Sequence, residues 1–474
     1  MVFSSLLFLY AFFPLSLLAY FLCRSQKAEN TALLIFSLVF YAWGEPLYVF
    51  LLMYMALIAW LCALCIEASP SRPVAKFWLV IAIVLHLSAI GFFKYSGFLC
   101  SVFGEPPEFI KNIALPIGIS FYTFQLLTYV VDIYRGEASA QESYWNVLLY
   151  ACLFHQCIAG PIVRYKSIEQ ELFVSRRSRG NLLSGIKRFA IGLAKKTLLA
   201  NPCGGLADSL LAGSSVELQS ISVLSGWIGM VAYMLQIYLD FSAYSDMAIG
   251  MGRMLGLHYP ENFNYPYIAR SVTEFWRRWH ISLSTFFRDY VYIPLGGNRC
   301  SKWRNILNLF IVWSLTGLWH GASWNYVFWG LYFFLFLVVE KYLIKDKLDR
   351  FPIIGHIYLL LVVFFGWIIF RFSDIASGVS VFRSLFGLNG NSFADFVSGT
   401  VLLNNSILLI VCAFVCTPCG KNAIQSVEKK LEAKGALSQV WEVFVSVVFP
   451  ILLLVLSTAT LVGDTYNPFI YFQF

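Results

Sequence analysis

The chain has 474 residues, of which 59% are hydrophobic and 13% are charged, whereas an average soluble domain is about 25% charged. This composition excludes a string of soluble domains and predicts one all-α polytopic membrane domain over residues 1–474. The formal net charge is +8, yet no stretch of soluble-domain size is present for a nucleic acid to bind. We therefore expect the excess Lys and Arg to mark cytoplasmic loops.

Apolar runs long enough to cross a bilayer follow one another along the chain, and the first lacks the basic flank of a cleavable signal peptide. They predict spans over 3–22, 31–45, 47–66, 77–97, 113–131, 223–247, 305–318, 324–343, 353–371, 401–416 and 440–462, with a weaker, interrupted candidate over 189–211. The apolar stretch 145–158 is too short to cross a core of about 30 Å at 1.5 Å per residue. It is predicted to be a re-entrant hairpin that closes at Ala159-Gly160-Pro161.

Two polar stretches, 161–196 and 250–304, are rich in Lys and Arg and poor in Asp and Glu. The positive-inside rule predicts that both lie on the cytoplasmic side. With the spans threaded accordingly, the loop 372–400, the amino terminus and the segment Tyr466–Phe474 are expected outside.

Polar groups inside the predicted span 223–247 are costly unless they face protein or water. Asp240, Tyr244 and Asp246 are of this kind, and we expect them to satisfy buried cations or irregular backbone rather than to take part in catalysis. His155, beside the predicted re-entrant turn, is likewise expected to be structural.

The cysteines do not predict a metal site. Cys62 and Cys65 share a span, and Cys412, Cys416 and Cys419 are spaced closely, but neither group has histidine partners at zinc spacing.

The stretch Glu274–Arg299 carries most of the polar chemistry. Its first half has helical character, with one apolar stripe (Phe275, Trp279, Leu283, Phe286 and Phe287) and a second stripe of Trp276, Arg277, His280 and Ser284. Glu274 and Arg278 have the spacing of an ion pair within a helix, and Asp289 can hold Arg288 or Arg299. The turn Leu295-Gly-Gly-Asn298 suits backbone contact with a ligand.

Two interpretations of this stretch remain open. It can be an interfacial helix whose arginines meet lipid phosphates, or it can bind a phosphate-bearing cytoplasmic donor, because guanidinium groups match phosphate geometry. The two are compatible.

His320 lies between the apolar runs Ile306–Leu315 and Val327–Val339, where an ionisable group is costly and usually functional. Because the span 305–318 is short, His320 is expected at a turn within the membrane, and Gly317 and Gly321 permit such a turn and close approach of a ligand. Two readings stand: a core histidine packed against Trp319 and Trp324, or a general base.

In order along the chain, these motifs resemble the membrane-bound O-acyltransferase (MBOAT) superfamily and its alginate O-acetyltransferase branch. They include Tyr41-Ala-Trp-Gly44, Leu115-Pro-Ile-Gly-Ile-Ser-Phe-Tyr-Thr-Phe124, Asp240-Phe-Ser-Ala-Tyr-Ser-Asp246, Glu274–His280, Arg288–Arg299, Leu318-Trp-His-Gly-Ala-Ser-Trp324 and the ending Phe469-Ile-Tyr-Phe472. The resemblance implies a ring of about 11–13 transmembrane and re-entrant helices around a central funnel. It also implies a multi-pass protein of the bacterial cytoplasmic membrane.

The resemblance assigns the family's catalytic histidine to His320 and its second histidine to His280. It implies acetyl transfer from cytoplasmic acetyl-CoA, a donor substrate rather than a bound cofactor, to an exported polysaccharide with an extracytoplasmic SGNH-type acetyltransferase as partner. Arg277, Arg278, Arg288 and Asn298 are then the expected donor contacts. A teichoic-acid D-alanyl transferase fed by a carrier-protein thioester is the near alternative. A transporter or flippase, which predicts repeated halves with broken helices, is the distant one.

Overall fold

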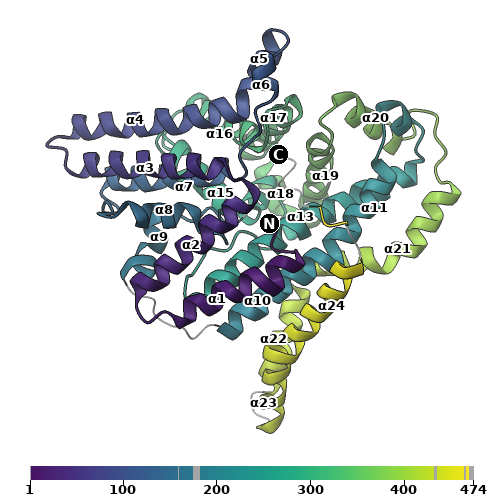
Figure 1. Ribbon diagram of the computed structural model, residues 1–474. Coiled ribbons are helices and arrows are strands. Elements are labelled where there is room, and N and C mark those ends of the chain that lie inside the picture. The colour runs from purple at the N-terminus through teal and green to yellow at the C-terminus, as the bar shows by residue number, and fades with distance from the viewer. Residues whose placement is uncertain (1, 158–159, 175–181, 432–434, 464–465, 469–474) are drawn as a thin grey trace. The chain divides into compact units, whose positions relative to one another are not determined.

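The computed structural model describes residues 2–157, 160–174, 182–431, 435–463 and 466–468, and the regular elements within these ranges are all helical (Figure 1). The chain forms two compact units, one of residues 1–189 and 244–261 and the other of residues 190–243 and 262–474. The two units are taken in turn.

The first unit is built from α1 to α9 and most of α10. Their bounds are α1 Phe13–Leu22, α2 Gln26–Gly44, α3 Tyr48–Glu67, α4 Arg72–Ile90, α5 Ser96–Phe103, α6 Glu108–Lys111, α7 Ile119–Arg135, α8 Tyr144–Cys152, α9 Tyr165–Glu169 and α10 Leu182–Ala194. Short π-helical segments precede α1 and join α4 to α5. Almost every residue of α7 is buried, and Gly118 and Gly136, both with φ of 76°, flank its two ends.

The second unit holds the helices that build the candidate site. Their bounds are α11 Asn201–Leu211, α12 Ser215–Gln219, α13 Val223–Met254 (which also contributes to the first unit), α14 Val272–Arg278, α15 Ile281–Phe286, α16 Lys302–His320, α17 Trp324–Val339, α18 Lys345–Arg350, α19 Pro352–Arg371, α20 Ile375–Leu385, α21 Phe396–Val415, α22 Cys419–Leu431, α23 Ala436–Val443 and α24 Phe449–Gly463.

The predicted spans fall on helices. Seven continuous helical stretches of the described chain are long and apolar enough to cross a membrane: Tyr48–Glu67, Arg72–Phe103, Val223–Met254, Trp324–Arg350, Pro352–Arg371, Phe396–Val415 and Ala436–Gly463. The remaining predicted spans coincide with shorter or less apolar helices, namely Phe8–Leu22, α2, α7 and α16. The interrupted candidate 189–211 is helical throughout, since a π-helical segment, Lys195–Ala200, joins α10 to α11. The all-α polytopic fold class is confirmed.

Helices α16 and α17 form a tight hairpin. A side chain at Gly317 would collide with the Tyr326 carbonyl, one at Gly330 with the Trp313 carbonyl, and one at Gly321 with the Tyr326 ring. Gly321 takes an extended backbone directly after the last residue of α16. The predicted turn after His320 is therefore confirmed, but the space at both predicted glycines is filled by α17 rather than by a ligand.

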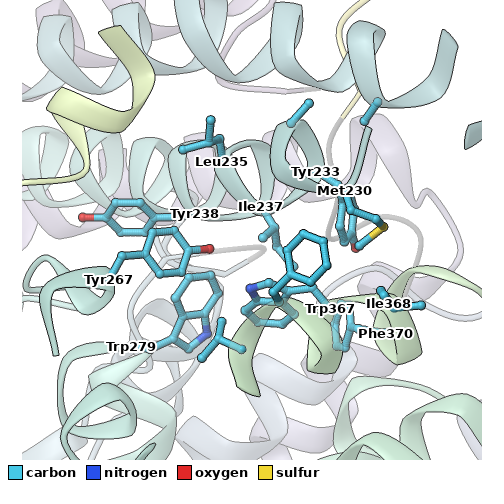
Figure 2. Close-up of a cluster of buried hydrophobic side chains, with 14 of the residues drawn as sticks. Met230, Tyr233, Leu235, Ile237, Tyr238, Tyr267, Trp279, Trp367, Ile368 and Phe370 are labelled. Atoms are coloured by element: carbon cyan, nitrogen blue, oxygen red, sulfur yellow. The ribbon is translucent and has the colours of Figure 1, made fainter. Parts of the chain in front are cut away.

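The core of the second unit is rich in aromatic side chains. Figure 2 shows Tyr238, Tyr267 and Trp279 grouped together, with Trp367 and Phe370 beside them. The rings of Trp279 and Trp367 are 5.0 Å apart, and those of Trp367 and Phe370 are 5.5 Å apart. Aromatic pairs at such distances add about 0.5–1.5 kcal/mol beyond their area of burial. This packing gives the site a rigid support.

Candidate functional site

A cavity of about 1060 Å³ opens among α14 to α18 of the second unit. Its wall combines apolar surface from Trp276, Leu283, Phe287, Leu309, Val312, Trp313, Leu337 and Leu348 with four cationic side chains (Arg277, Arg288, Lys341 and Lys345) and three acidic ones (Glu274, Glu340 and Asp349). A cavity of this size, largely apolar but carrying clustered charges, suits an amphipathic ligand that has an anionic end.

Helix α14 is fixed at its N-terminus by two side chains. Ser271 accepts a hydrogen bond from the Glu274 backbone N–H at 3.0 Å, which is an N-cap. The Glu340 carboxylate, brought by α17, accepts from the backbone N–H of Val272 and, at 2.9 Å, from that of Thr273. A carboxylate at a helix N-terminus is favourable, so the charge of Glu340 is largely satisfied by α14.

His280 breaks the predicted helical stretch. The backbone of His280 takes φ of 45°, in the left-handed region, and separates α14 from α15. Asn262 causes the break, because its backbone oxygen accepts from Ile281 N and its side-chain oxygen accepts from Ser282 N at 3.2 Å. The predicted helical character is confirmed on both sides of this break, and the predicted apolar stripe is buried.

The contacts of His280 define its tautomer. The side-chain oxygen of Asn262 lies 3.1 Å from His280 Nδ1 and already accepts from the Ser282 backbone, so it acts as an acceptor and Nδ1 carries the proton. His280 lies outside the candidate spans, and burial lowers its pKa from 6.5 to about 3. The ring is therefore neutral near pH 7, and Nε2 is its hydrogen-bond acceptor.

The structure separates the predicted arginines. Arg277 and Arg288 line the cavity, as do the other members of the predicted polar stripe, Trp276, His280 and Ser284. Arg278 does not, since it pairs with Glu274 at 2.8 Å and donates to the Asn264 carbonyl at 3.1 Å. Its ion pair with Glu274 was predicted from the spacing and is confirmed.

Arg288 keeps a carboxylate beside its guanidinium. Its Nε lies 2.6 Å from Asp289 Oδ1, and this hydrogen bond raises the pKa of Arg288. The predicted contact between Asp289 and Arg288 is thus present, and the guanidinium still faces the cavity.

Asn298 lies in a turn that α16 and α17 hold in place. Its side-chain oxygen accepts from the Tyr292 hydroxyl at 2.7 Å and from Lys341 Nζ at 2.6 Å. Asn305 of α16 donates to the Gly297 carbonyl at 2.8 Å and accepts from Lys341. Asn298 therefore lines the cavity as predicted, and it also orients Lys341.

Lys341 and Lys345 are wall residues that the sequence analysis did not single out. Lys341 falls inside the predicted span 324–343, where hydropathy outweighs a single charge. The usable signal was the basic run that follows, with Lys345, Lys347 and Arg350.

His320 is the last residue of α16 and is 6% exposed. The cavity follows α16 along Leu309, Val312, Trp313 and Thr316, so it reaches a residue about one helical turn before His320. The imidazole packs against Trp319, Trp329 and Phe370, with ring centroids 4.9, 4.9 and 5.2 Å away. The structure thus brings His280, Arg277, Arg288 and Asn298 to one cavity and places His320 just beyond it.

Trp319 lies against both histidines. Its ring is 5.6 Å from that of His280 and 4.9 Å from that of His320. The Trp276 ring, on the cavity wall, is 4.8 Å from Trp313 and 5.5 Å from Trp329. Ring contacts thus connect the cavity wall to His320.

The acidic residues of α13 have structural partners, as expected. Asp240 pairs with Lys196 in the second unit at 2.7 Å, and Asp246 pairs with Arg188 in the first at 2.5 Å. His155 is buried and its Nδ1 lies 2.6 Å from the Tyr259 hydroxyl. Among the described residues, no group of three or more His, Cys, Asp or Glu side chains is arranged to hold a metal ion.

The fold and the cavity define a multi-pass, all-α membrane protein that has a charged, partly apolar binding chamber. The family model for membrane-bound O-acyltransferases (MBOAT) matches residues 135–382. The chain belongs to the MBOAT family and, within it, to the branch of the alginate O-acetylases; it is an acyltransferase.

Three relatives illustrate the branch. The chain is similar to the probable alginate O-acetylase AlgI of Pseudomonas putida, with 34% identity over all of both chains. The AlgI protein of Pseudomonas aeruginosa is 38% identical over 86% of this chain and 81% of its own. A peptidoglycan O-acetyltransferase of Helicobacter pylori is 31% identical over 83% of this chain and 81% of its own. Homology to these enzymes supports O-acetylation of a polysaccharide.

Proposed function

We propose that this protein takes the acetyl group of cytoplasmic acetyl-CoA and passes it across the bacterial cytoplasmic membrane for O-acetylation of an exported polysaccharide. The observation that carries the proposal is the 1060 Å³ cavity, in which Arg277, Arg288, Lys341 and Lys345 surround an apolar chamber that ends one helical turn before His320. An extracytoplasmic SGNH-type acetyltransferase is the expected partner that completes the delivery.

The cationic wall residues would bind the phosphates of the donor. Guanidinium and ammonium groups bind phosphate oxygens through charge-assisted hydrogen bonds. The apolar surface along Leu309, Val312 and Trp313 would accommodate the thioester arm. The acetyl group would then lie at the inner end of the cavity, next to His320.

His320 would act as the general base. It takes the proton of an attacking acceptor hydroxyl, whose oxygen forms a bond to the acetyl carbonyl carbon; the carbon–sulfur bond breaks, and the thiolate leaves and is protonated as free CoA thiol. A positioned base of this kind contributes about 10²–10⁴ in rate. His280 stays neutral, and its Nε2 would accept a hydrogen bond from the bound donor.

The charge distribution supports a cytoplasmic position for the cavity. The cavity contains residues of the stretch 250–304 and of the basic run after α17, and such clusters lie on the cytoplasmic side. The acetyl relatives match more than four-fifths of the chain, which favours an acetyl donor over the D-alanyl alternative.

The test measures label transfer from [¹⁴C]acetyl-CoA in inverted membrane vesicles that contain the polymer-producing system. We expect His320→Ala to lower incorporation at least a hundredfold, and His258→Ala, which removes an exposed histidine paired with Glu171, to leave it unchanged. Equal incorporation of label by the wild type and by His320→Ala would refute the role of His320 as the general base. No use of acetyl-CoA, together with use of a carrier-protein thioester, would instead establish the D-alanyl alternative.

A further inference from the structure

A second cleft, of about 530 Å³, lies in the second unit where α12 packs against α20. Its lining is mostly polar: Gln219, Ser220, Arg383, Asn389, Gly390 and Asn391, with Val216 and Leu388 as the apolar members. This cleft shares no residue with the cavity at α14 to α18. Its chemistry differs as well, because amide groups dominate it.

Ser384 orders the loop that carries two of these amides. Its hydroxyl donates to the Leu218 carbonyl at 2.9 Å and accepts from Asn389 Nδ2 at 3.0 Å and Asn391 Nδ2 at 3.2 Å. The loop then joins the start of α13, since Val223 N and Leu224 N donate to the carbonyls of residues 392 and 393 at 3.1 and 2.9 Å. The cleft is therefore preformed.

The amide groups of the cleft use their nitrogens inside the protein, and those of Gln219 and Asn389 leave their oxygens available. Gln219 Nε2 donates to Ser380, and the nitrogens of Asn389 and Asn391 are engaged as described above. Within the described chain, the oxygens of Gln219 and Asn389 accept no hydrogen bond, whereas the Asn391 oxygen is buried; Arg383, which is exposed, makes no ion pair. The cleft thus offers two acceptors and one guanidinium.

Charge places this cleft on the side opposite the cytoplasm. It lies at the ends of three candidate spans: the start of α13, the end of α19 and the start of α21. The connection 372–400 contains one cation, Arg383. The opposite ends of α19 and α21 are flanked by Lys345, Lys347 and Arg350 and by Lys421, Lys429 and Lys430, as the positive-inside rule requires of cytoplasmic loops.

We propose that this cleft binds a short segment of an acidic polysaccharide on the extracytoplasmic side. Sugar hydroxyls donate to the oxygens of Gln219 and Asn389, and Arg383 binds a sugar carboxylate. A protein partner is disfavoured, because interface centres are rich in aromatic and apolar side chains and this lining holds two aliphatic residues. The inference rests on the proposed function for the claim that the polymer is the acetyl acceptor.

The test measures binding of a hexameric oligouronate, and of a neutral glucan hexamer, to the purified full chain by saturation-transfer NMR titration. We expect Arg383→Gln to weaken oligouronate binding about three- to fivefold, as for an exposed charge pair, with Arg383→Lys intermediate. Gln219→Ala should weaken binding of both sugars. The matched control is Arg350→Gln, an exposed arginine at the other end of α19, which should change neither.

Oligouronate binding that is unchanged by both Arg383→Gln and Gln219→Ala would overturn the proposal, as would displacement of the oligouronate by glycerol 1-phosphate, which would assign the cleft to lipid headgroups. The acetyl-transfer assay is independent of this titration. Loss of acetyl-CoA use with intact, Arg383-dependent sugar binding would refute the proposed function alone. Intact acetyl transfer without sugar binding would refute only the proposal that the cleft binds a polysaccharide.

Discussion

The Lys196 ammonium lies 2.7 Å from the Asp240 carboxylate, and both side chains are 1% exposed. Lys196 also donates to the Pro468 carbonyl. One cation thus joins the π-helical segment after α10 to α13 and to the end of the described chain. Burying two charges is costly, so the attraction between them mainly offsets desolvation, whereas removing one partner leaves the other uncompensated.

We therefore expect Asp240→Asn and Lys196→Met each to destabilise the protein by about 3–5 kcal/mol. The double change Lys196→Met with Asp240→Asn should recover most of that loss, because no charge then remains buried. Thermal unfolding of the purified protein in one detergent, compared across the four proteins, measures both effects. Additive losses in the double variant would show that the two residues act independently.

His280 gives the folded protein a predictable response to acid. Its pKa is lowered by burial to about 3 from 6.5, so between these values the unfolded chain binds more protons than the folded one. Stability from this group is therefore complete above about pH 6.5 and is lost as the pH falls toward 3. Between pH 7.5 and 4.5 the loss is about 3 kcal/mol at most.

The variant His280→Asn isolates this effect, because Asn accepts positive φ and does not titrate. The free energy of unfolding should fall less for the variant than for wild type between pH 7.5 and 4.5. Parallel losses in the two proteins would mean that His280 does not carry the acid sensitivity.

The spans could be predicted because hydropathy is a local property of the sequence. The conformation of His280 could not, since it depends on Asn262, 18 residues earlier, whose oxygens draw the backbone out of the helix. Hydrophobic periodicity and helix propensity describe residues that are close in the sequence, and they contain no information on such a distant acceptor.

The residues that line the cavity could be predicted only in part, because their contacts also depend on residues that are distant in the sequence. Arg277 and His280 share a stripe, so spacing alone placed them together. Whether Arg278 also faces the ligand depended on Glu274 and on the Asn264 carbonyl. Lys341 was concealed by the apolar residues around it. The motifs could predict which residues belong to the site, but the direction in which each side chain points depends on the fold.

The adjacent residues Arg277 and Arg278 should have different roles. Arg277→Ala removes a cavity cation and should raise the apparent KM for acetyl-CoA about tenfold, which corresponds to one charge-assisted hydrogen bond. Arg278→Ala breaks the pair with Glu274 and should leave KM nearly unchanged while lowering the melting temperature slightly. Steady-state kinetics on both variants tests the assignment. Similar KM values for the two would mean that Arg277 does not contact the donor.

The glycines of the α16–α17 hairpin should be irreplaceable for the position of His320. Ala at Gly317 would place a methyl group against the Tyr326 carbonyl, and the helices would have to separate at a cost of about 1–3 kcal/mol. Because His320 follows one turn later on α16, we expect Gly317→Ala to reduce kcat more than it raises KM.

The matched control for this change is Gly399→Ala in α21, where an added methyl group has no neighbour within 4 Å; it should be neutral or slightly stabilising because Ala favours helix. Thermal unfolding and acetyl-transfer kinetics on both variants measure the two effects. If Gly317→Ala kept both its melting temperature and its kcat, the close packing of α16 on α17 would have no part in holding His320 at the end of the cavity.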